Sequence, residues 1–423
     1  MRIAVVVTGG LHPSGREQVV PSWLSLFGRL ARAHNVHAFV LRHLPEASTY
    51  ELNGMVVHDL GRPSAPLGLT HWAQQRALVR AIDLAGPYDL IHGIWGDPAA
   101  FLATRAARHF SIPSVVTLDS GEFVSLPDIG YGSQRTARGR ARIREACTKA
   151  SRVHVCTEFM AREVEKFGIT PAIIPLGVDE PEGSSPQVGG GVDEPEGSSP
   201  QVGGGVDEPE GSSPQVGGGV NEPEGSSPQV GGGKPLGLPD GPPWRLLQVA
   251  SLSRVKNQAL LIDALAIMAR SADVHLDLVG EDTLGGTLRA RAVALGMGDR
   301  VTFHGFVHHD QIAAIRSRAH VYVQTSRHES AGVAVLEAAM NGTPVIGTAV
   351  GYVADWAPGG AAAIKGDASP GELADATVAL LRDSIRRRQL AASALAFARA
   401  HDADRTAEDV EKMYAALHIL QHR

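Results

Sequence analysis

The chain has 423 residues, of which 43% are hydrophobic and 20% are charged, a globular composition that is too long for one ordinary domain. Its two cysteines, Cys147 and Cys156, exclude a disulfide framework or a cysteine-rich metal cluster and are typical of a reducing cytoplasm. The first apolar run is too short for a signal peptide, and no run approaches the roughly 20 residues that span a bilayer. We therefore expect a cytoplasmic protein with two domains, at most peripheral at a membrane.

The formal net charge of −6 is unevenly distributed along the chain. Residues 177–232 contain eleven acidic residues and no lysine or arginine, so the rest of the chain carries a net charge of +5. A mildly basic folded part suits anionic small-molecule ligands, and it does not single out nucleic acid as a partner.

The first part of the chain alternates strand-like and helix-like segments. Strands are expected at residues 3–7, 36–41, 89–92, 113–118, 152–156 and 172–175, and helices at 18–33, 72–84, 98–109, 136–149 and 161–167. Such alternation predicts right-handed βαβ units and a parallel sheet that is covered by helices on both faces.

The middle of the chain is a tandem repeat. A 14-residue unit, GVDEPEGSSPQVGG, starts at Gly177 and recurs from Gly191, Gly205 and Gly219. Each unit offers two valines and almost nothing else to bury, so the repeat should be disordered and cannot stack as a solenoid. It is interpreted as a flexible linker, with a docking or spacing role as the alternative.

The alternation resumes at Trp244. Strands are expected at residues 245–250, 275–279, 301–303, 319–324, 344–346 and 362–364, and helices at 259–271, 284–295, 310–318, 331–340, 370–382 and most of 383–414. This pattern predicts a second Rossmann-like unit.

The junction between strand 319–324 and helix 331–340 carries the strongest functional pattern. A helix that begins at the carboxyl end of a strand offers free N–H groups and a positive dipole end to a phosphate, and Gly332 lets a ligand approach the backbone. Glu329 precedes the helix. Glu337 lies within an otherwise apolar helix, and a buried carboxylate needs a partner.

Residues 329–345 read ESAGVAVLEAAMNGTPV and are similar to the E-x7-E motif of retaining glycosyltransferases with the GT-B fold, especially family 4. Ala331 stands where the family usually has an aromatic residue. The resemblance implies an α/β GT-B fold, in which two Rossmann-like domains face each other across a cleft. Residues 1–176 would form the acceptor domain, 177–241 the disordered linker, 242–403 the nucleotide-sugar donor domain, and 404–423 a helix that crosses back to the first domain.

The resemblance also implies roles for residues of the second domain. Glu337 would accept hydrogen bonds from the donor ribose, and Glu329 would contact the transferred sugar. Arg254 and Lys256 would bind the diphosphate together with the helix start at Gly332 and Val333, so that no metal and no cofactor is required. Gly280 and Glu281 resemble a loop that lines the nucleotide. Asp402 and Asp404 match a D-x-D pattern but lie outside a strand end, and are interpreted as solvated surface.

In the first domain, Gly15 resembles a family loop that approaches phosphate or acceptor, although simple turn geometry explains a lone glycine equally. Asp119 stands where many relatives have a histidine directed at the transferred sugar, and it could bind hydroxyls or act as a base. Glu122 is an alternative to Asp119. His92 ends a strand and is either directed at the cleft or structural.

A dense run of cations occupies residues 135–152. It is either a solvated helix face or a surface for peripheral membrane contact, which would suit a lipid-linked acceptor. The members of this run are Arg135, Arg138, Arg140, Arg142, Arg144, Lys149 and Arg152.

The favoured hypothesis is a retaining, metal-independent glycosyltransferase that moves a sugar from a nucleotide sugar to a glycan, lipid-linked or small-molecule acceptor. The alternatives are a catalytically silent protein that binds nucleotide sugars and a sugar-nucleotide epimerase. Neither donor nor acceptor can be identified from a motif, because loops and backbone contacts set specificity.

Overall fold

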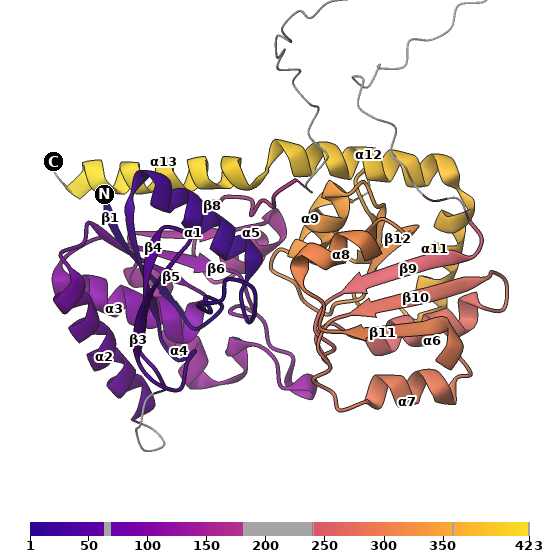
Figure 1. The fold of residues 1–423 in the computed structure, drawn as a ribbon, viewed down its shortest axis with the longest axis horizontal. Coiled ribbons are helices and arrows are strands. Elements are labelled where there is room, and N and C mark those ends of the chain that lie inside the picture. Colours follow the sequence, from indigo (N-terminus) through magenta and orange to yellow (C-terminus); the bar gives the residue numbers. More distant parts are fainter. Residues whose placement is uncertain (63–68, 181–238, 240, 358, 422–423) are drawn as a thin grey trace, which may run out of the picture. The chain divides into compact units, whose positions relative to one another are not determined.

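Two sheets organise the residues that the computed structural model describes, which are 1–62, 69–180, 239, 241–357 and 359–421 (Figure 1). The first sheet has eight strands in the order β3-β4-β2-β1-β5-β6-β7-β8. The elements around it are β1 (Arg2–Val7), α1 (Pro21–Ala33), β2 (Asn35–Val40), β3 (Ser48–Leu52), β4 (Met55–Asp59), α2 (Thr70–Ala85), β5 (Leu90–Ile94), α3 (Phe101–Phe110), β6 (Ser114–Leu118), α4 (Ala137–Lys149), β7 (Arg152–Val155), α5 (Glu158–Glu165) and β8 (Ala172–Ile173).

The second sheet has six parallel strands in the order β11-β10-β9-β12-β13-β14. Its elements are β9 (Trp244–Val249), α6 (Gln258–Met268), β10 (Val274–Val279), α7 (Thr287–Ala294), β11 (Val301–Gly305), α8 (His309–Arg316), β12 (Val321–Gln324), α9 (Val333–Met340), β13 (Val345–Thr348), α10 (Tyr352–Trp356), β14 (Ala362–Ile364), α11 (Pro370–Arg382), α12 (Ser384–Ala400) and α13 (Ala403–Gln421). The predicted pair of Rossmann-like sheets is confirmed.

Strand β1 shows why each sheet needs helices on both faces. Ile3, Val5 and Val7 pack in one hydrophobic core with α1 and α13, whereas Ala4 and Val6 pack in another with α2 and α3. Successive side chains of a strand point to opposite faces, so an apolar run without alternation has to be buried on both sides. The continuous apolar runs in the sequence therefore correctly predicted the buried parallel strands.

The hairpin of β3 and β4 was not predicted. β3 pairs antiparallel with β4 at the edge of the first sheet. Its residues, Ser-Thr-Tyr-Glu-Leu, are mostly polar and only the last is buried. An edge strand with one open side needs little apolar surface, so it leaves a weak signal in the sequence.

Helix α1 begins at Pro21 and not at residue 18 as expected, because Gln18 has a positive φ of 49° and proline is favoured in the first turn of a helix. The linker expected at 177–241 lies almost entirely outside the described residues. No helix among the described residues is both long and apolar enough to cross a membrane.

Helix α13 lies against α1, although it follows the second sheet in the sequence (Figure 1). Asp404 at its start accepts a hydrogen bond of 2.6 Å from Nε of Arg29 on α1. Asp404 is exposed, as its interpretation as solvated surface expected, and its ion pair with Arg29 links the start of α13 to α1.

His92 is structural. Its Nδ1 lies 2.5 Å from the hydroxyl of Tyr414 on α13, and its Nε2 lies 2.6 Å from Oγ1 of Thr117. All three side chains are buried. Burial, together with the nearby His154, lowers the pKa of His92 well below its usual value. A neutral imidazole that is hydrogen-bonded through both ring nitrogens thus joins α13 to the core of the first sheet.

We expect Tyr414→Phe to lower the free energy of unfolding by about 1–3 kcal/mol, because it leaves Nδ1 of buried His92 without a partner. Urea denaturation followed by circular dichroism would measure the change. Lys412→Ala, which removes an exposed cation from the same helix, should change stability by less than about 0.5 kcal/mol. Equal stability of the two variants would contradict the role of the His92–Tyr414 contact.

Candidate active site

Helix α9 begins directly after the loop that leaves β12, at the carboxyl end of the second sheet. Gly332 is its N-cap residue and has a φ of 83°, a left-handed conformation that favours glycine. A Cβ at this position would also lie 3.2 Å from Oε1 of Gln324. No side chain caps this end of the helix, so its positive dipole end is open to an anion, as predicted.

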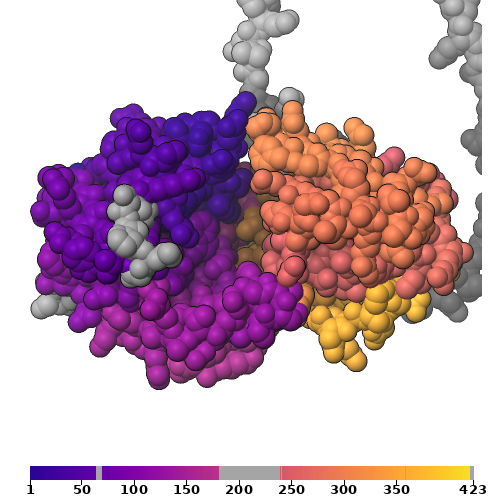
Figure 2. All heavy atoms as spheres, turned by 90° about the horizontal axis from the view of Figure 1, so that it is seen from below, coloured from indigo at the N-terminus to yellow at the C-terminus, as the bar shows by residue number. Residues whose placement is uncertain are grey.

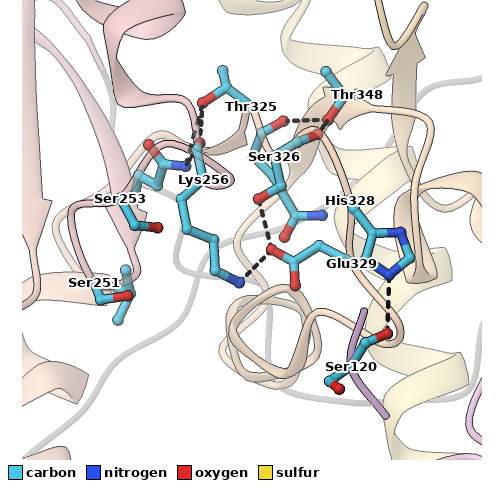
Figure 3. A network of polar contacts seen from close by, with 12 residues as sticks. Ser120, Ser251, Ser253, Lys256, Thr325, Ser326, His328, Glu329 and Thr348 are labelled. Atoms are coloured by element: carbon cyan, nitrogen blue, oxygen red, sulfur yellow. Dashed lines mark hydrogen bonds and ion pairs between the residues drawn. The ribbon is translucent and has the colours of Figure 1, made fainter. Parts of the chain in front are cut away.

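Lys256 and Glu329 form an ion pair beside this helix end (Figure 3). Nζ of Lys256 lies 2.5 Å from Oε1 of Glu329, and the hydroxyl of Ser326 donates to the same oxygen over 2.6 Å. The hydroxyl of Thr325 donates to the backbone oxygen of Lys256, which holds the loop after β9 against the loop after β12. The two predicted residues thus meet because adjacent strands of the sheet end side by side.

A cavity of about 230 Å³ opens at this point. Its wall contains the predicted Asp119, Lys256, Glu329, Gly332 and Val333. Two buried glutamines also line it, and neither Oε1 of Gln248 nor Nε2 of Gln324 has a hydrogen-bond partner. Since buried polar atoms are normally paired, these two atoms point to a polar ligand or water that completes the cavity.

Asp119 reaches the cavity from the end of β6 in the first sheet. Burial raises the pKa of its carboxyl group to about 7, and the negative charges of Glu122 and Glu329 add to the effect. Glu122 itself is fully engaged: its two carboxylate oxygens accept hydrogen bonds from the backbone N–H groups of Gly96 (2.9 Å) and Ser120 (2.8 Å). Glu122 therefore shapes the loop, and Asp119 is the carboxylate available to a ligand.

Glu337 lines a second cavity, of about 550 Å³, which lies toward the other end of α9. Its Oε2 accepts a hydrogen bond of 2.6 Å from Nη1 of Arg316, and its Oε1 lies 2.9 Å from Nε2 of His309. Burial alone would raise the pKa of Glu337, but the contact with His309 and the charge of Arg316 outweigh burial and lower it. The prediction that this carboxylate needs a partner is confirmed.

Four predicted site residues line neither of these two cavities. Arg254 is exposed and lines a different hollow with Arg291 and Arg327. Gly15 lines a hollow beside α1. Gly280 has a packing role, because a Cβ there would lie 2.0 Å from the backbone oxygen of Ala250, and Glu281 accepts a backbone hydrogen bond from Leu252. Their assignment to nucleotide binding stays a prediction.

Sequence reasoning missed several side chains of the two cavities. Gln248 and Gln324 lie in strands, where a single polar residue near the carboxyl end is the only available signal. Arg316 lies in the last turn of α8, where an arginine usually contacts solvent and the helix dipole. Nothing in the linear sequence places it against a glutamate on the next helix.

The seven cations of residues 135–152 fall into two groups in the structure: one is paired and half-buried, and six are exposed. Arg142 is half-buried and pairs with Asp97 at 3.2 Å. The other six cations are exposed, on α4 and its flanks. The part of the chain that contains α4 is magenta in Figure 2. Among the described residues, no three His, Cys, Asp or Glu side chains are grouped as a metal site would require.

Two family models match the chain. Residues 236–396 match "Glycosyl transferases group 1", and residues 19–177 match "Glycosyl transferase 4-like domain". The first model thus covers the second sheet, and the second covers the first sheet apart from β1, on either side of the repeat.

Characterised relatives match parts of the chain. D-inositol 3-phosphate glycosyltransferase of Arthrobacter sp. (strain FB24) is 32% identical over 197 residues, which are 44% of this chain and 47% of the relative. Phosphatidyl-myo-inositol mannosyltransferase of Mycobacterium leprae is 31% identical over 170 residues, 38% of this chain and 42% of the relative. The chain spans less than half the length of the curated relatives that it matches.

Solved structures share the whole fold at low sequence identity. Sucrose-phosphate synthase from Thermosynechococcus elongatus has a TM-score of 0.70 at 18% identity, with 98% of each chain covered. HepE of Anabaena in complex with UDP-glucose has a TM-score of 0.66 at 17% identity, with 98% of this chain and 100% of the other covered. Because family models match the second sheet and the first sheet apart from β1, and the fold is that of these structures, this chain belongs to the GT-B glycosyltransferases of group 1, of the family 4 type.

Proposed function

We propose that the protein is a retaining glycosyltransferase that transfers a sugar from a nucleotide diphosphate sugar to a hydroxyl group of a glycan, lipid-linked or small-molecule acceptor without a resident metal. The observation that carries this proposal is the first cavity, where the open end of α9, the Lys256–Glu329 pair and Asp119 meet. Family membership and the activities named for the relatives support it.

The charges around α9 suit a nucleotide sugar. Lys256 and the helix end at Gly332 supply positive charge where a departing diphosphate would need it. Glu337 lies near the opposite end of the same helix, where a ribose could donate its hydroxyl hydrogen atoms. Structures of HepE contain UDP and UDP-glucose, which supports a nucleotide sugar as the ligand class.

The setting of Glu329 suits stabilisation of charge better than nucleophilic attack. Its Oε1 is already bound by Lys256 and Ser326, and an ion-paired, hydrogen-bonded carboxylate is a weaker nucleophile than a free one. We therefore infer that Glu329 holds positive charge at the anomeric carbon while the acceptor attacks on the side of the leaving phosphate. That course retains the anomeric configuration.

A thermal-shift screen tests donor binding. UDP-, GDP- and ADP-glucose, each with EDTA present, should include one compound that raises the melting temperature of the protein. Lys256→Ala should weaken its binding by at least about tenfold, because the diphosphate loses a direct cation. Arg254→Ala is the matched comparison, and we expect a smaller effect because Arg254 lines another hollow.

Each of three results would count against this assignment. The absence of a shift with every nucleotide sugar would favour a differently liganded GT-B protein. A normal shift without any product in the presence of acceptors would favour the silent binding protein, and conversion of the donor alone to an isomer would indicate an epimerase.

The raised pKa of Asp119 gives a pH signature. If its ionised form accepts the acceptor's proton, the transfer rate should rise with pH through about 7, because the carboxyl group is protonated and inactive as a base below that value. Rate measurements between about pH 5.5 and 8.5 would show this limb. Asp119→Asn should be slower and lack the limb, and an unchanged pH profile in that variant would exclude Asp119 as the base.

The exposed cations of α4 favour a lipid-linked acceptor at an anionic membrane surface. We expect the protein to float with vesicles that contain phosphatidylserine but not with neutral vesicles, and Arg138→Glu with Arg144→Glu should abolish flotation. Arg318→Glu with Arg388→Glu, the same charge change in the turn after α8 and on α12, should leave it intact. Equal loss in both pairs would show a general charge effect and no docking surface.

A further inference from the structure

The two partners of Glu337 differ sharply in exposure. The side chain of Arg316 is 5% exposed, whereas that of His309 is 52% exposed, and Glu337 between them is 12% exposed. Arg316 is thus a buried counter-ion whose removal would leave an uncompensated charge. His309 is a partner that solvent and ligands can reach.

Helix geometry explains why both side chains meet one carboxylate. His309 is the first residue of α8 and Arg316 is the last. Seven residues are close to two turns, so both side chains lie on one face of α8, and this face is directed at α9. Arg316 takes Oε2 of Glu337 and His309 takes Oε1.

The imidazole of His309 is surrounded by charges of both signs. The hydrogen bond with Glu337 raises the pKa of His309, burial opposes this, and the charges of Glu337 and Asp179 raise it while that of Arg316 lowers it. Arg16 and Asp310 also line the cavity into which Glu337 opens. On balance the pKa of His309 is raised, so the protonated imidazole is favoured next to Glu337.

We propose that His309 is a positioning residue that controls access of the donor ribose to Oε1 of Glu337. This inference rests on the proposed function. In the unliganded protein His309 occupies Oε1, and a bound nucleotide sugar exchanges the imidazole for a ribose hydroxyl. Arg316 stays in place and keeps the carboxylate ionised. His309 therefore has to leave Glu337 before the ribose is held.

The exchange makes donor affinity depend on pH with a defined sign. The imidazolium form binds Glu337 more strongly than the neutral imidazole, because the contact is then an ion pair as well as a hydrogen bond. A ligand that breaks this contact favours the neutral form and releases a proton. Donor affinity should therefore fall as the pH falls through the pKa of His309, and be full above it.

Calorimetric titration tests whether His309 leaves Glu337 when the donor binds. The ligand is whichever of UDP-, GDP- and ADP-glucose binds the protein. These diphosphate diesters do not change charge between about pH 5.5 and 8.5. We expect the Kd of the native protein to be about fivefold higher at the acidic end of this range. His309→Gln, which can still donate a hydrogen bond but does not titrate, should lose this rise of Kd at the acidic end.

His308→Gln is the matched control, because it removes the neighbouring imidazole, which lies edge-to-face with Phe306, whereas the contact with Glu337 is made by His309. It should keep the native slope. A native slope in His309→Gln would overturn the proposal. A loss of affinity in His309→Gln that is equal at every pH would also overturn it, since the imidazole would then contact the donor directly.

A measurement without ligand separates this inference from the proposed function. In histidine-labelled protein, NMR titration should show a lower pKa for His309 in Glu337→Gln than in the native protein. If the pKa falls and no nucleotide sugar binds, the proposed function fails, and with it the role of the contact in ribose access. If nucleotide sugars bind and the pKa of His309 is unchanged in Glu337→Gln, the inference about His309 alone is wrong.

Discussion

The start of helix α9 at the carboxyl end of the second sheet is the constraint on which the candidate site depends. Gly332 takes a left-handed conformation that favours glycine, and it leaves the helix end without a side-chain cap. The open N-terminus then creates an electropositive point in the wall of the first cavity. Lys256 reaches the same point only because β9 and β12 are neighbours in the sheet and their loops are hydrogen-bonded to each other.

The two carboxylates of the motif, Glu329 and Glu337, have different partners and line different cavities. Glu329 is paired with a half-buried lysine and a serine hydroxyl in the smaller cavity. Glu337 is paired with a buried arginine in a larger one, which lowers its pKa despite burial. Asp119 has no comparable cation, and its pKa rises to about 7. The motif thus holds two carboxylates that are each paired with a cation, while the third acidic group, Asp119, titrates near neutrality.

The polar contacts of α13 show how the chain ties its last helix to its first sheet. Tyr414 reaches His92 in the core, and Asp404 binds Arg29 at the surface. The buried polar groups of His92 and Tyr414 are costly unless each has its partner in place. They therefore favour one placement of α13 over the many that its apolar residues alone would permit.

Much of the fold could be predicted from the amino-acid sequence. Continuous apolar runs such as residues 3–7 could only be strands buried on both faces, and the alternation with helices implied parallel sheets. Edge strand β3 could not be read, because a strand with one exposed face needs few apolar residues. The repeat was recognisable from composition, although it lies outside the described residues.

The sequence by itself determined the local chemistry of the site: a glycine before a helix, two glutamates eight positions apart, and a lysine after a strand. Local spacing is enough for these features, because strand, loop and helix follow one another directly. Only the tertiary structure decided that Lys256 faces Glu329 while Arg254, two residues away, lines another hollow, and that Arg316 and His309 hold Glu337. Those choices depend on which strands and helices are neighbours in space, and side-chain contacts across elements leave no periodic trace in a single sequence.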